Sequence, residues 1–485
     1  MSSRRSLLAA RRLFHRGSFR SQRRRCLSTT RNGEDSNIYD VVCIGGGPAG
    51  LSLVTALRSN PVTSRLRVAL VEAQDLSKTA SWSLPPTQFS NRCSSLTPFS
   101  ARFLESMGAW AHLKRERVQE YQEMQVWDGV TGARIDFDWA ESGQTIAYMV
   151  ENLNLTSALL RRLHDLGAVD VFDKAKLESI GFGSATDDYD LTDWPVVHLA
   201  SGKSLTARLL VGADGANSPV RSFAGIESRG WDYDRHGVVA TLELEGDGWG
   251  GQSRKIAYQR FLPTGPVAML PLPGKYATLV WSTTPELATV LKKLSANDFV
   301  AIVNAAFRLS PVDLDYMHNH PTGLAEELAW RLQHTEVHAQ DIPQTVVGLQ
   351  EGSVASFPLK MRHADTYIGE RVALIGDAAH SIHPLAGQGL NQGQGDVESL
   401  VRAINYSVSH GQDLGRQLSL ESYNRERYTA NHLLLGVCDK LHKVFAVEQG
   451  PIVPLRSLGL AAVQNLVPLK RFFMERASGA GARVN

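Results

Sequence analysis

The sequence predicts an α/β fold in which a Rossmann-like domain carries an inserted antiparallel sheet and is followed by a helical region. Three observations predict it. Apolar runs that lead into glycine-rich turns and then into helix-like runs recur, beginning near residues 39, 209 and 371. Strand-like alternation opens the segment 231–354. Apolar residues at helical spacing dominate from residue 406 onward.

The composition fits a globular chain of two or three domains, because its 485 residues are 43% hydrophobic. Its four cysteines (Cys26, Cys43, Cys93 and Cys438) form no CxxC pair. Neither a disulfide framework nor a zinc site is indicated, and we expect no metal. No apolar run reaches the ~18–20 residues that a membrane span needs, so we expect a soluble or peripheral protein.

The first 33 residues differ from the rest, with ten arginines, six serines and no acidic residue. That composition is typical of a mitochondrial transit peptide, and we expect cleavage within 26–34. The alternative is a disordered arm that binds nucleic acid. Removal of residues 1–33 leaves 41 basic and 49 acidic residues, a net charge of about −8. The formal charge of +2 therefore does not indicate a nucleic-acid partner.

A dinucleotide fingerprint follows the first strand-like run, YDVVCI at 39–44, and precedes the helix-like run LSLVTALRSN. Gly45 permits a tight turn, Gly47 lets backbone approach a pyrophosphate, and Gly50 lets the helix pack on the strand. The second strand-like run, LRVALVEA, ends at Glu72, where an acid accepts hydrogen bonds from ribose hydroxyls. The pattern predicts a bound dinucleotide, either FAD or NAD.

Two later segments repeat the strand–turn–helix plan. LLVGADGANSPVRSFAGI, residues 209–226, places Asp214 just after its strand. RVALIGDAAHSIHPLAGQGLNQGQGDVESL, residues 371–400, places Asp377 in the same position. Ligands of parallel sheets collect at the carboxyl ends of the strands. A Gly-Asp turn alone is more often structural, but the shared plan predicts that both carboxylates lie near the fingerprint.

Together these motifs resemble those of the FAD-dependent aromatic hydroxylases of the p-hydroxybenzoate hydroxylase type. The resemblance implies that FAD is the cofactor and that its ADP part lies at the fingerprint and Glu72. It places the ribityl chain at Asp377, and it assigns Asp214 to a motif at the FAD site that is linked to NAD(P)H use. It also implies that Arg92, in SNRCSSLTPFS, contacts FAD. The alternative for Arg92 is a surface cation at a helix start.

The stretch HPLAGQGLNQGQGD, His383 to Asp396, resembles the signature of the ubiquinone-biosynthesis branch of that family. YMVENLNLTSALLRRL, AYQRFLPTGPVAMLPLP and LVPLKRFFMERASG also resemble it, so the likeness covers residues 39–476. With the presequence, the chain is similar to mitochondrial members of fungi and animals. This implies hydroxylation at C5 of a polyprenyl-4-hydroxybenzoate-type ring through a C4a-hydroperoxyflavin.

Glycines in that stretch predict a close approach of backbone to the flavin. We expect Gly387, Gln388, Gly389, Leu390 and Asn391 to pass under the isoalloxazine ring. They would lie at the N-terminus of a helix that begins near Asn391. Backbone N–H groups and a helix N-terminus stabilise the negative charge that a reduced flavin carries.

His380 and His383 are the candidates for catalytic proton donors. The alternative is that they hydrogen-bond within this loop and only position it. No other acid or base is identified from the sequence. Phe261, Leu270 and Trp281, on strand-like runs, are candidate pocket residues, although apolar strand residues are more often plain core.

The motifs predict five segments. These are a transit peptide (1–33), an FAD-binding domain in two pieces (39–230 and 355–405), a substrate domain between the pieces (231–354) and a C-terminal helical region (406–485). The end of the helical region, with Lys470, Arg471 and Arg476, is expected either to pack on its own FAD domain or to contact a membrane or a partner.

The resemblance further implies O₂, ferredoxin and ferredoxin reductase as reaction partners, a complex with other ubiquinone-biosynthesis proteins, and a peripheral location on the matrix side of the inner membrane. No second GxGxxG domain for a nicotinamide follows the first. Two other functions stay open: an NAD(P)H-dependent phenol hydroxylase for another aromatic, and a mainly scaffolding flavoprotein. The presequence and HPLAGQG oppose the first, and the intact nucleotide motifs oppose the second.

Overall fold

The computed structural model describes residues 37–139, 144–185, 190–247, 255–336, 342–382 and 387–466. Residues from Ile38 onward form one compact unit. The expected transit peptide, the candidate His383 and the basic residues Lys470, Arg471 and Arg476 lie outside the described residues.

A sheet with a parallel centre carries the predicted nucleotide motifs. Its order is β18-β19-β11-β1-β2-β8, with β10 joined to β11 and β9 joined to β10. Neighbours from β19 to β8 run parallel, whereas β18, β10 and β9 pair antiparallel. The strands are β1 (Ile38–Ile44), β2 (Val68–Val71), β8 (Val169–Phe172), β9 (Leu177–Phe182), β10 (Pro195–Leu199), β11 (Ser204–Gly212), β18 (Ile368–Gly369) and β19 (Val372–Leu374).

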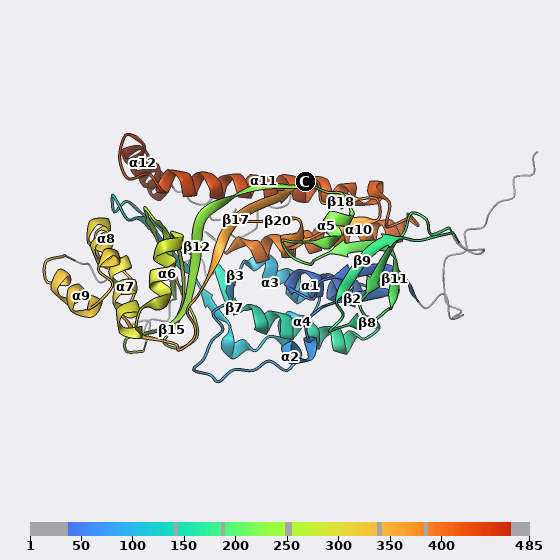
Figure 1. Ribbon diagram of the computed structural model, residues 1–485, viewed down its shortest axis with the longest axis horizontal. Coiled ribbons are helices and arrows are strands. Elements are labelled where there is room, and N and C mark those ends of the chain that lie inside the picture. Colours follow the sequence, from blue (N-terminus) through green and yellow to red (C-terminus); the bar gives the residue numbers. More distant parts are fainter. Residues whose placement is uncertain are drawn as a thin grey trace, which may run out of the picture. The chain divides into compact units, whose positions relative to one another are not determined.

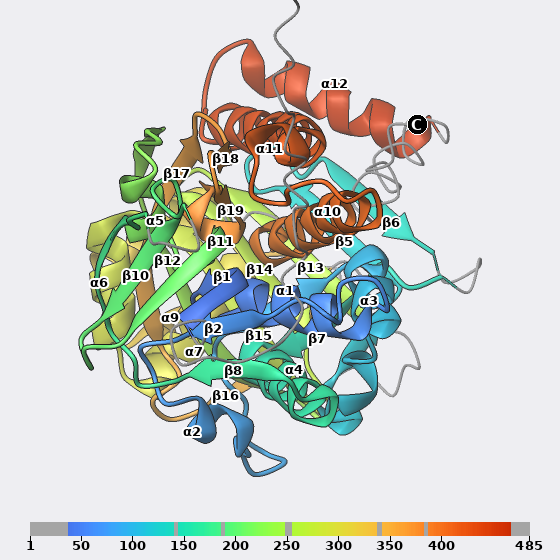
Figure 2. The same ribbon diagram turned by 90° about the vertical axis from the view of Figure 1, so that its right-hand side faces the viewer.

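β2 and the part of β1 from Val41 to Ile44 are continuous apolar runs and are fully buried, as expected for parallel strands that helices cover on both faces. α1 packs against both α4 and α10, and α10 packs against α11. Figure 2 shows α10, α11 and α12 stacked on one side of this sheet. The helices are α1 (Pro48–Ser59), α2 (Leu76–Ala80), α3 (Pro98–Ser106), α4 (Asn152–Leu166), α5 (Pro219–Phe223), α10 (Gln388–Ser409), α11 (Gln417–Phe445) and α12 (Ile452–Asn465).

A second sheet is mostly antiparallel, with the order β20-β17-β12-β15-β14-β13-β5-β6 and with β16 beside β12. Its apolar face packs on α6–α9, which lie together at the left of Figure 1. The elements are β5 (Glu123–Asp128), β6 (Arg134–Asp138), β12 (Ser228–Leu244), β13 (Ile256–Leu262), β14 (Gly265–Pro271), β15 (Tyr276–Thr283), β16 (Val346–Leu349), β17 (Ala355–Ala364), β20 (His380–Ser381), α6 (Pro285–Lys293), α7 (Ala296–Arg308), α8 (Pro311–Asn319) and α9 (Leu324–Leu332).

A small sheet, β3-β7-β4, lies between these parts of the chain. Its strands are β3 (Cys93–Leu96), β4 (Gln119–Tyr121) and β7 (Ala147–Glu151). Short 3-10 turns complete the described elements: η2 (Trp110–His112), η3 (Arg115–Arg117) and η6 (Gly376–Ala378).

The predicted α/β fold class is confirmed. The second sheet extends beyond the segment 231–354, because β5, β6, β17 and β20 join it from either side in the sequence. Among the described helices, none is long and apolar enough to cross a membrane.

The helix expected near Asn391 begins earlier, at Gln388. Gly387 has a left-handed backbone, with φ +58°, and this turns the chain directly into the first helical turn. The expected start was wrong by three residues, because the glycines of the first helical turn are typical of a loop in sequence.

Candidate functional site

Four predicted site residues gather at one edge of the parallel sheet. Parallel strands bring their carboxyl ends to the same edge. Gly45 follows β1, Glu72 follows β2, and Asp214 lies two residues beyond β11. Asp377 lies in η6, just after β19. The sheet therefore assembles residues that are more than 300 positions apart in the sequence.

The turn from β1 into α1 leaves no room for side chains at two glycines. Gly45 has φ +109°, and a Cβ there would lie 2.2 Å from the carbonyl oxygen of Ala213. A Cβ at Gly50 would lie 1.9 Å from the carbonyl oxygen of Gly45. Gly47 differs, since a Cβ there would meet no described atom within 4 Å. Gly47 is the N-cap of α1, and no side chain caps the first N–H groups of this helix. The open space at Gly47 therefore borders free N–H groups.

Glu72 is held in place by backbone. Its Oε2 accepts a hydrogen bond from Gly46 N at 2.5 Å, and its Oε1 accepts one from Gln74 N at 2.8 Å. Each carboxylate oxygen keeps a second lone pair for another donor. The carboxylate is thus fixed beside the glycine turn and can still accept from a hydroxyl group.

Asp214 has an unused oxygen in a confined place. One of its oxygens accepts from Val220 N at 3.2 Å. Its Oδ1 is buried and has no hydrogen-bond partner among the described residues. Burial raises the pKa of Asp214, since the charged form loses water. A buried acceptor of this kind calls for a donor, such as a hydroxyl group of a ligand.

Arg221, for which the sequence predicted no role, connects the Asp214 turn to the Asp377 turn. Its Nη1 donates to Ala378 O at 2.8 Å and its Nη2 donates to Ala216 O at 2.7 Å. Asp377 is exposed, whereas its neighbours in η6 are buried. It lies at the edge where the other motifs meet, and desolvation by the surrounding protein raises the pKa of its carboxyl group.

Arg92 is exposed and directly precedes β3, not a helix. No hydrogen bond or ion pair joins its side chain to another residue in the described part of the chain. The expected helix start at Arg92 is wrong, because α3 begins only at Pro98, but its exposure agrees with the alternative of a surface cation. Ser95, in β3, lies beside Gly387, so Arg92 precedes the strand that meets the start of α10.

The first turn of α10 has free backbone donors, since the first N–H groups of a helix lack an intrahelical partner. Gln388, Gly389 and Leu390 supply them, and all three are half-buried. The side chain of Asn391 makes its hydrogen bonds to β3 and to the start of α3. Its Nδ2 donates to Ser95 O at 2.8 Å, and its Oδ1 accepts from Ser100 Oγ at 2.8 Å and from Thr97 N at 3.0 Å. Asn391 therefore braces the turn, and a direct contact between its side chain and flavin stays a prediction.

The FAD binding domain family matches residues 38–338 and 325–435 of the chain. The mitochondrial ubiquinone biosynthesis monooxygenase COQ6 of Schizosaccharomyces pombe is 42% identical over 445 residues, which cover 90% of this chain and 91% of that protein. The COQ6 protein of Saccharomyces cerevisiae is 39% identical, covering 91% and 94%. The human one is 37% identical, covering 91% and 92%.

The chain belongs to the family of FAD-dependent ubiquinone biosynthesis monooxygenases.

Two solved structures share the fold of this monooxygenase. The p-nitrophenol 4-monooxygenase PnpA of Pseudomonas putida has a TM-score of 0.64 at 19% identity, covering 92% of this chain and 99% of its own. PqsL of Pseudomonas aeruginosa, a probable FAD-dependent monooxygenase, has a TM-score of 0.62 at 21% identity, covering 87% and 99%. At these identities the likeness shows the fold alone.

FAD is the cofactor of the monooxygenase, and the carboxyl edge fits it in three respects. The turn at Gly45 and Gly50 admits only backbone, so a pyrophosphate can reach the N-terminus of α1. Glu72 and Asp377 present carboxylate oxygens at strand ends. Asp214 holds a buried oxygen that lacks a donor among the described residues.

The glycines of HPLAGQGLNQGQGD serve two purposes in the monooxygenase. Gly387 and Gly389 lie at the start of α10, next to Ser95 and Ile382. Gly393 and Gly395 lie deeper and are packing positions. A Cβ at Gly393 would lie 3.6 Å from the Cα of Gly376, and one at Gly395 would lie 2.9 Å from the guanidinium of Arg427.

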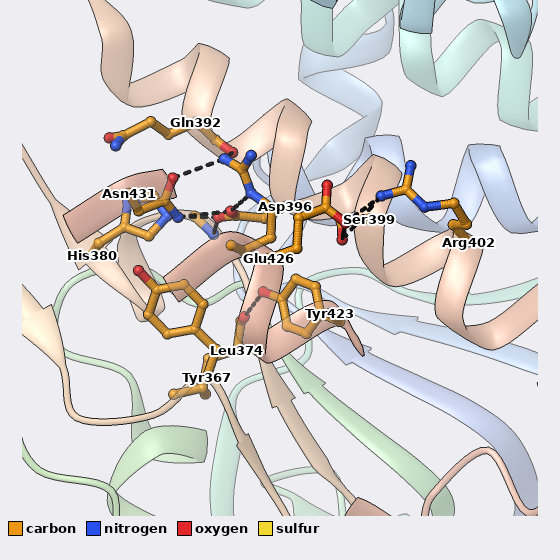
Figure 3. A network of polar contacts seen from close by, with 12 residues as sticks. Tyr367, Leu374, His380, Gln392, Asp396, Ser399, Arg402, Tyr423, Glu426 and Asn431 are labelled. Carbon is orange, nitrogen blue, oxygen red and sulfur yellow. Dashed lines mark hydrogen bonds and ion pairs between the residues drawn. The ribbon is translucent and has the colours of Figure 1, made fainter. Parts of the chain in front are cut away.

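His380 belongs to a buried network centred on Asp396 (Figure 3). Asp396 Oδ2 accepts from His380 Nε2 at 2.6 Å and from Gly376 N at 3.1 Å. Asp396 Oδ1 accepts from Arg427 Nε and from Asn431 Nδ2, each at 2.9 Å. Burial alone would raise the pKa of Asp396, but the positive charges of His380 and Arg427 outweigh it and lower the pKa to about 2.

The network supports a positioning role for His380. The residue is only 2% exposed, and its Nε2 is engaged by Asp396. Through Asp396 it is joined to Gly376 N, in the turn that presents Asp377. No sequence motif marks Arg427 or Asn431 as members of the site, because they lie one helix further along the chain.

The three apolar candidates have different places. Trp281 is fully buried in the core of the second sheet, and Leu270 is half-buried beside a small core cluster. Phe261 packs between the β13–β14 turn and the end of α11. Its ring stacks on Phe445 with centroids 4.0 Å apart.

Alanine at Gly50 and alanine at Gly47 should act differently. Gly50→Ala forces a methyl group against the Gly45 carbonyl, so we expect a loss of about 1–3 kcal/mol in the free energy of unfolding together with loss of FAD. Gly47→Ala meets no described atom, so stability should change by less than about 0.5 kcal/mol while FAD affinity falls. Urea unfolding of the FAD-free chain and fluorescence titration with FAD measure the two effects. Unchanged FAD affinity in Gly47→Ala would remove the pyrophosphate from this turn.

Asp396→Asn should destabilise the protein by about 3–5 kcal/mol, because it leaves the buried Arg427 guanidinium without its carboxylate. Glu426→Gln is the matched control on the same pair of helices. Its partner Arg402 is 56% exposed, so we expect a change of at most about 1 kcal/mol. Chemical unfolding of both variants provides the comparison, and equal losses would show that Asp396 is no more important than a surface carboxylate.

Proposed function

We propose that this chain hydroxylates the aromatic ring, at C5, of a polyprenyl-4-hydroxybenzoate-type intermediate of ubiquinone biosynthesis. Its relatives are named ubiquinone biosynthesis monooxygenases and match about nine tenths of its length. The observation that carries the proposal is the gathering of Gly45, Glu72, Asp214 and Asp377 at one sheet edge, beside the start of α10.

Each site residue has a proposed role toward FAD. Backbone at Gly45, Gly47 and Gly50 holds the pyrophosphate of the ADP part, and Glu72 accepts from its ribose. Asp377 is proposed to contact the ribityl chain, Asp214 a nearby hydroxyl group of FAD, and Arg92 the side of the flavin ring.

Bound FAD supplies the activation of O₂ that the insertion of oxygen into a ring requires. The chain contributes orientation and charge. The free N–H groups of Gln388, Gly389 and Leu390 lie at the positive end of α10, where they stabilise negative charge on the flavin. Asn391 holds this turn against β3 and α3, so the donors are fixed before the reaction begins.

His380 acts, in this proposal, as a positioning residue and not as a proton donor. Its buried bond to Asp396 fixes the turn that carries Asp377. His383 lies outside the described residues and remains a candidate proton donor by sequence alone.

The proposed surroundings are mitochondrial. The relatives are named mitochondrial proteins, and the first 33 residues have the composition of a transit peptide. We place the enzyme at the matrix side of the inner membrane, where its polyprenylated substrate resides, in a complex with other proteins of the pathway. Ferredoxin and ferredoxin reductase are the proposed electron donors. The family resemblance supports them.

The test uses the chain without residues 1–33, loaded with FAD and supplied with a prenylated 4-hydroxybenzoate. Reduction by NADPH alone is compared with reduction by NADPH, ferredoxin reductase and ferredoxin. We expect a ring-hydroxylated product only in the second case. Rapid NADPH oxidation without ferredoxin would favour a phenol hydroxylase for another aromatic. Bound FAD with no product under either condition would favour a scaffolding role.

Asp377→Ala should weaken FAD binding roughly tenfold to a hundredfold, because a hydrogen bond to a charged group contributes about 1.5–3 kcal/mol. Asp377→Asn keeps one acceptor oxygen and should recover part of the affinity. Asp377 is exposed, so neither change should lower the stability of the FAD-free chain. Titration of the FAD-free chain with FAD checks the order, and equal affinities would assign Asp377 to the turn alone.

A further inference from the structure

The last two helices expose aliphatic side chains along one side of the molecule. Figures 1 and 2 both show α11 and α12 on that side, outside α10. We define the α11–α12 face by its exposed apolar residues, which are Leu433, Val437, Leu441, Val444, Ile452, Leu455, Leu458 and Leu466. Leu455 and Leu458 are 64% and 67% exposed. Contiguous apolar surface of this kind marks a place of interaction.

The exposed apolar residues of α11 follow a helical spacing. Leu433, Val437, Leu441 and Val444 recur every three or four positions, so they lie on one side of α11. Leu435, Cys438 and Phe445 on the same helix are buried against the protein. The exposed side of the C-terminal half of α11 therefore carries four aliphatic residues besides Lys440, whereas the outer side of a helix that borders water is mainly polar.

A buried ion pair holds the two helices in place. Arg456 of α12 binds Asp128 at the end of β5 through two hydrogen bonds, of 2.8 Å and 3.0 Å. Its Nη1 also donates to Val444 O at 3.0 Å, near the end of α11. On β6, Asp136 N donates to Gln464 Oε1 at 2.9 Å. The exposed aliphatic residues thus belong to a fixed surface.

Lysine and tryptophan lie around this surface. Lys440 is exposed and forms no ion pair with another described residue. Lys443 pairs with Asp439 at 2.9 Å, and its Nζ lies 4.9 Å from the centroid of the half-exposed Trp231 ring. Lysine and tryptophan beside an aliphatic area are typical of helices that lie in a membrane interface.

We propose that the α11–α12 face binds the surface of a lipid bilayer, with both helices lying in its interface. Protein-binding hot spots favour Trp, Tyr and Arg over Leu and Val, and this face has the opposite composition. Among the described helices none can span a bilayer, so the helices lie on the membrane. The choice of a bilayer rests in part on the proposed function, because a polyprenylated substrate dissolves in lipid.

The test measures partition of the FAD-loaded chain, without residues 1–33, onto phosphatidylcholine vesicles with and without cardiolipin. We expect binding to both, stronger with cardiolipin because of Lys440 and Lys443. Leu455→Gln combined with Leu458→Gln should lower the partition coefficient by roughly tenfold for each leucine. The matched control is Val312→Gln with Trp330→Gln, on α8 and α9, which are 80% and 56% exposed and should leave binding unchanged.

Three results would overturn the proposal. One is equal vesicle binding by the wild-type chain and the double leucine variant. Another is a dimer, seen by light scattering, that the leucine variant disrupts while vesicles stay unbound. The third is vesicle binding that occurs only after residues 467–485 are deleted, since that segment would then cover the face. Vesicle binding is measured without turnover, so failure to hydroxylate the substrate leaves this result independent. FAD content confirms that each variant is folded.

Discussion

The carboxylate of Asp396 accepts four hydrogen bonds in a fully buried place, and these bonds join the parts of the protein that matter for the site. The donors come from the turn before Asp377, from β20 and from α11, while Asp396 itself belongs to α10. A buried carboxylate without donors would be costly, so the four elements must meet in one arrangement. This constraint sets the position of α10, and α10 presents the loop proposed for the flavin.

Close packing at glycines makes that arrangement possible. α10 approaches α11 closely at Gly395, where a Cβ would lie 2.9 Å from the guanidinium of Arg427. The turn between β1 and α1 is also closely packed, because the lack of side chains at Gly45 and Gly50 lets α1 lie against the sheet. In both places backbone groups, not side chains, border the space that a cofactor needs. The side chains of Asn391 and Arg221 donate hydrogen bonds to backbone carbonyls and so hold these turns in position.

α11 links the site to the outer surface. Its Arg427 and Asn431 reach inward to Asp396, while Leu433 and Val437, one turn further on, are exposed. A rigid helix of this length lets one element hold the cofactor loop and also present an apolar face. Binding of that face to a membrane would therefore fix the orientation of the site relative to the lipid that carries the substrate.

The sequence by itself determined the fold class and the nucleotide motifs, because each of these depends on short contiguous patterns. The same patterns left FAD and NAD open as the cofactor, and the family resemblance selected FAD. A strand, a glycine turn and a helix are encoded within about 20 residues, and so are the two later turns that carry Asp214 and Asp377. Only the tertiary structure decided that His380 pairs with Asp396, that Asn391 braces Ser95 and Ser100, and that Arg92 precedes a strand. These contacts join residues up to 296 positions apart. The identity of a polar residue shows that it needs a partner, but the partner is chosen by packing between distant segments, which no local pattern encodes.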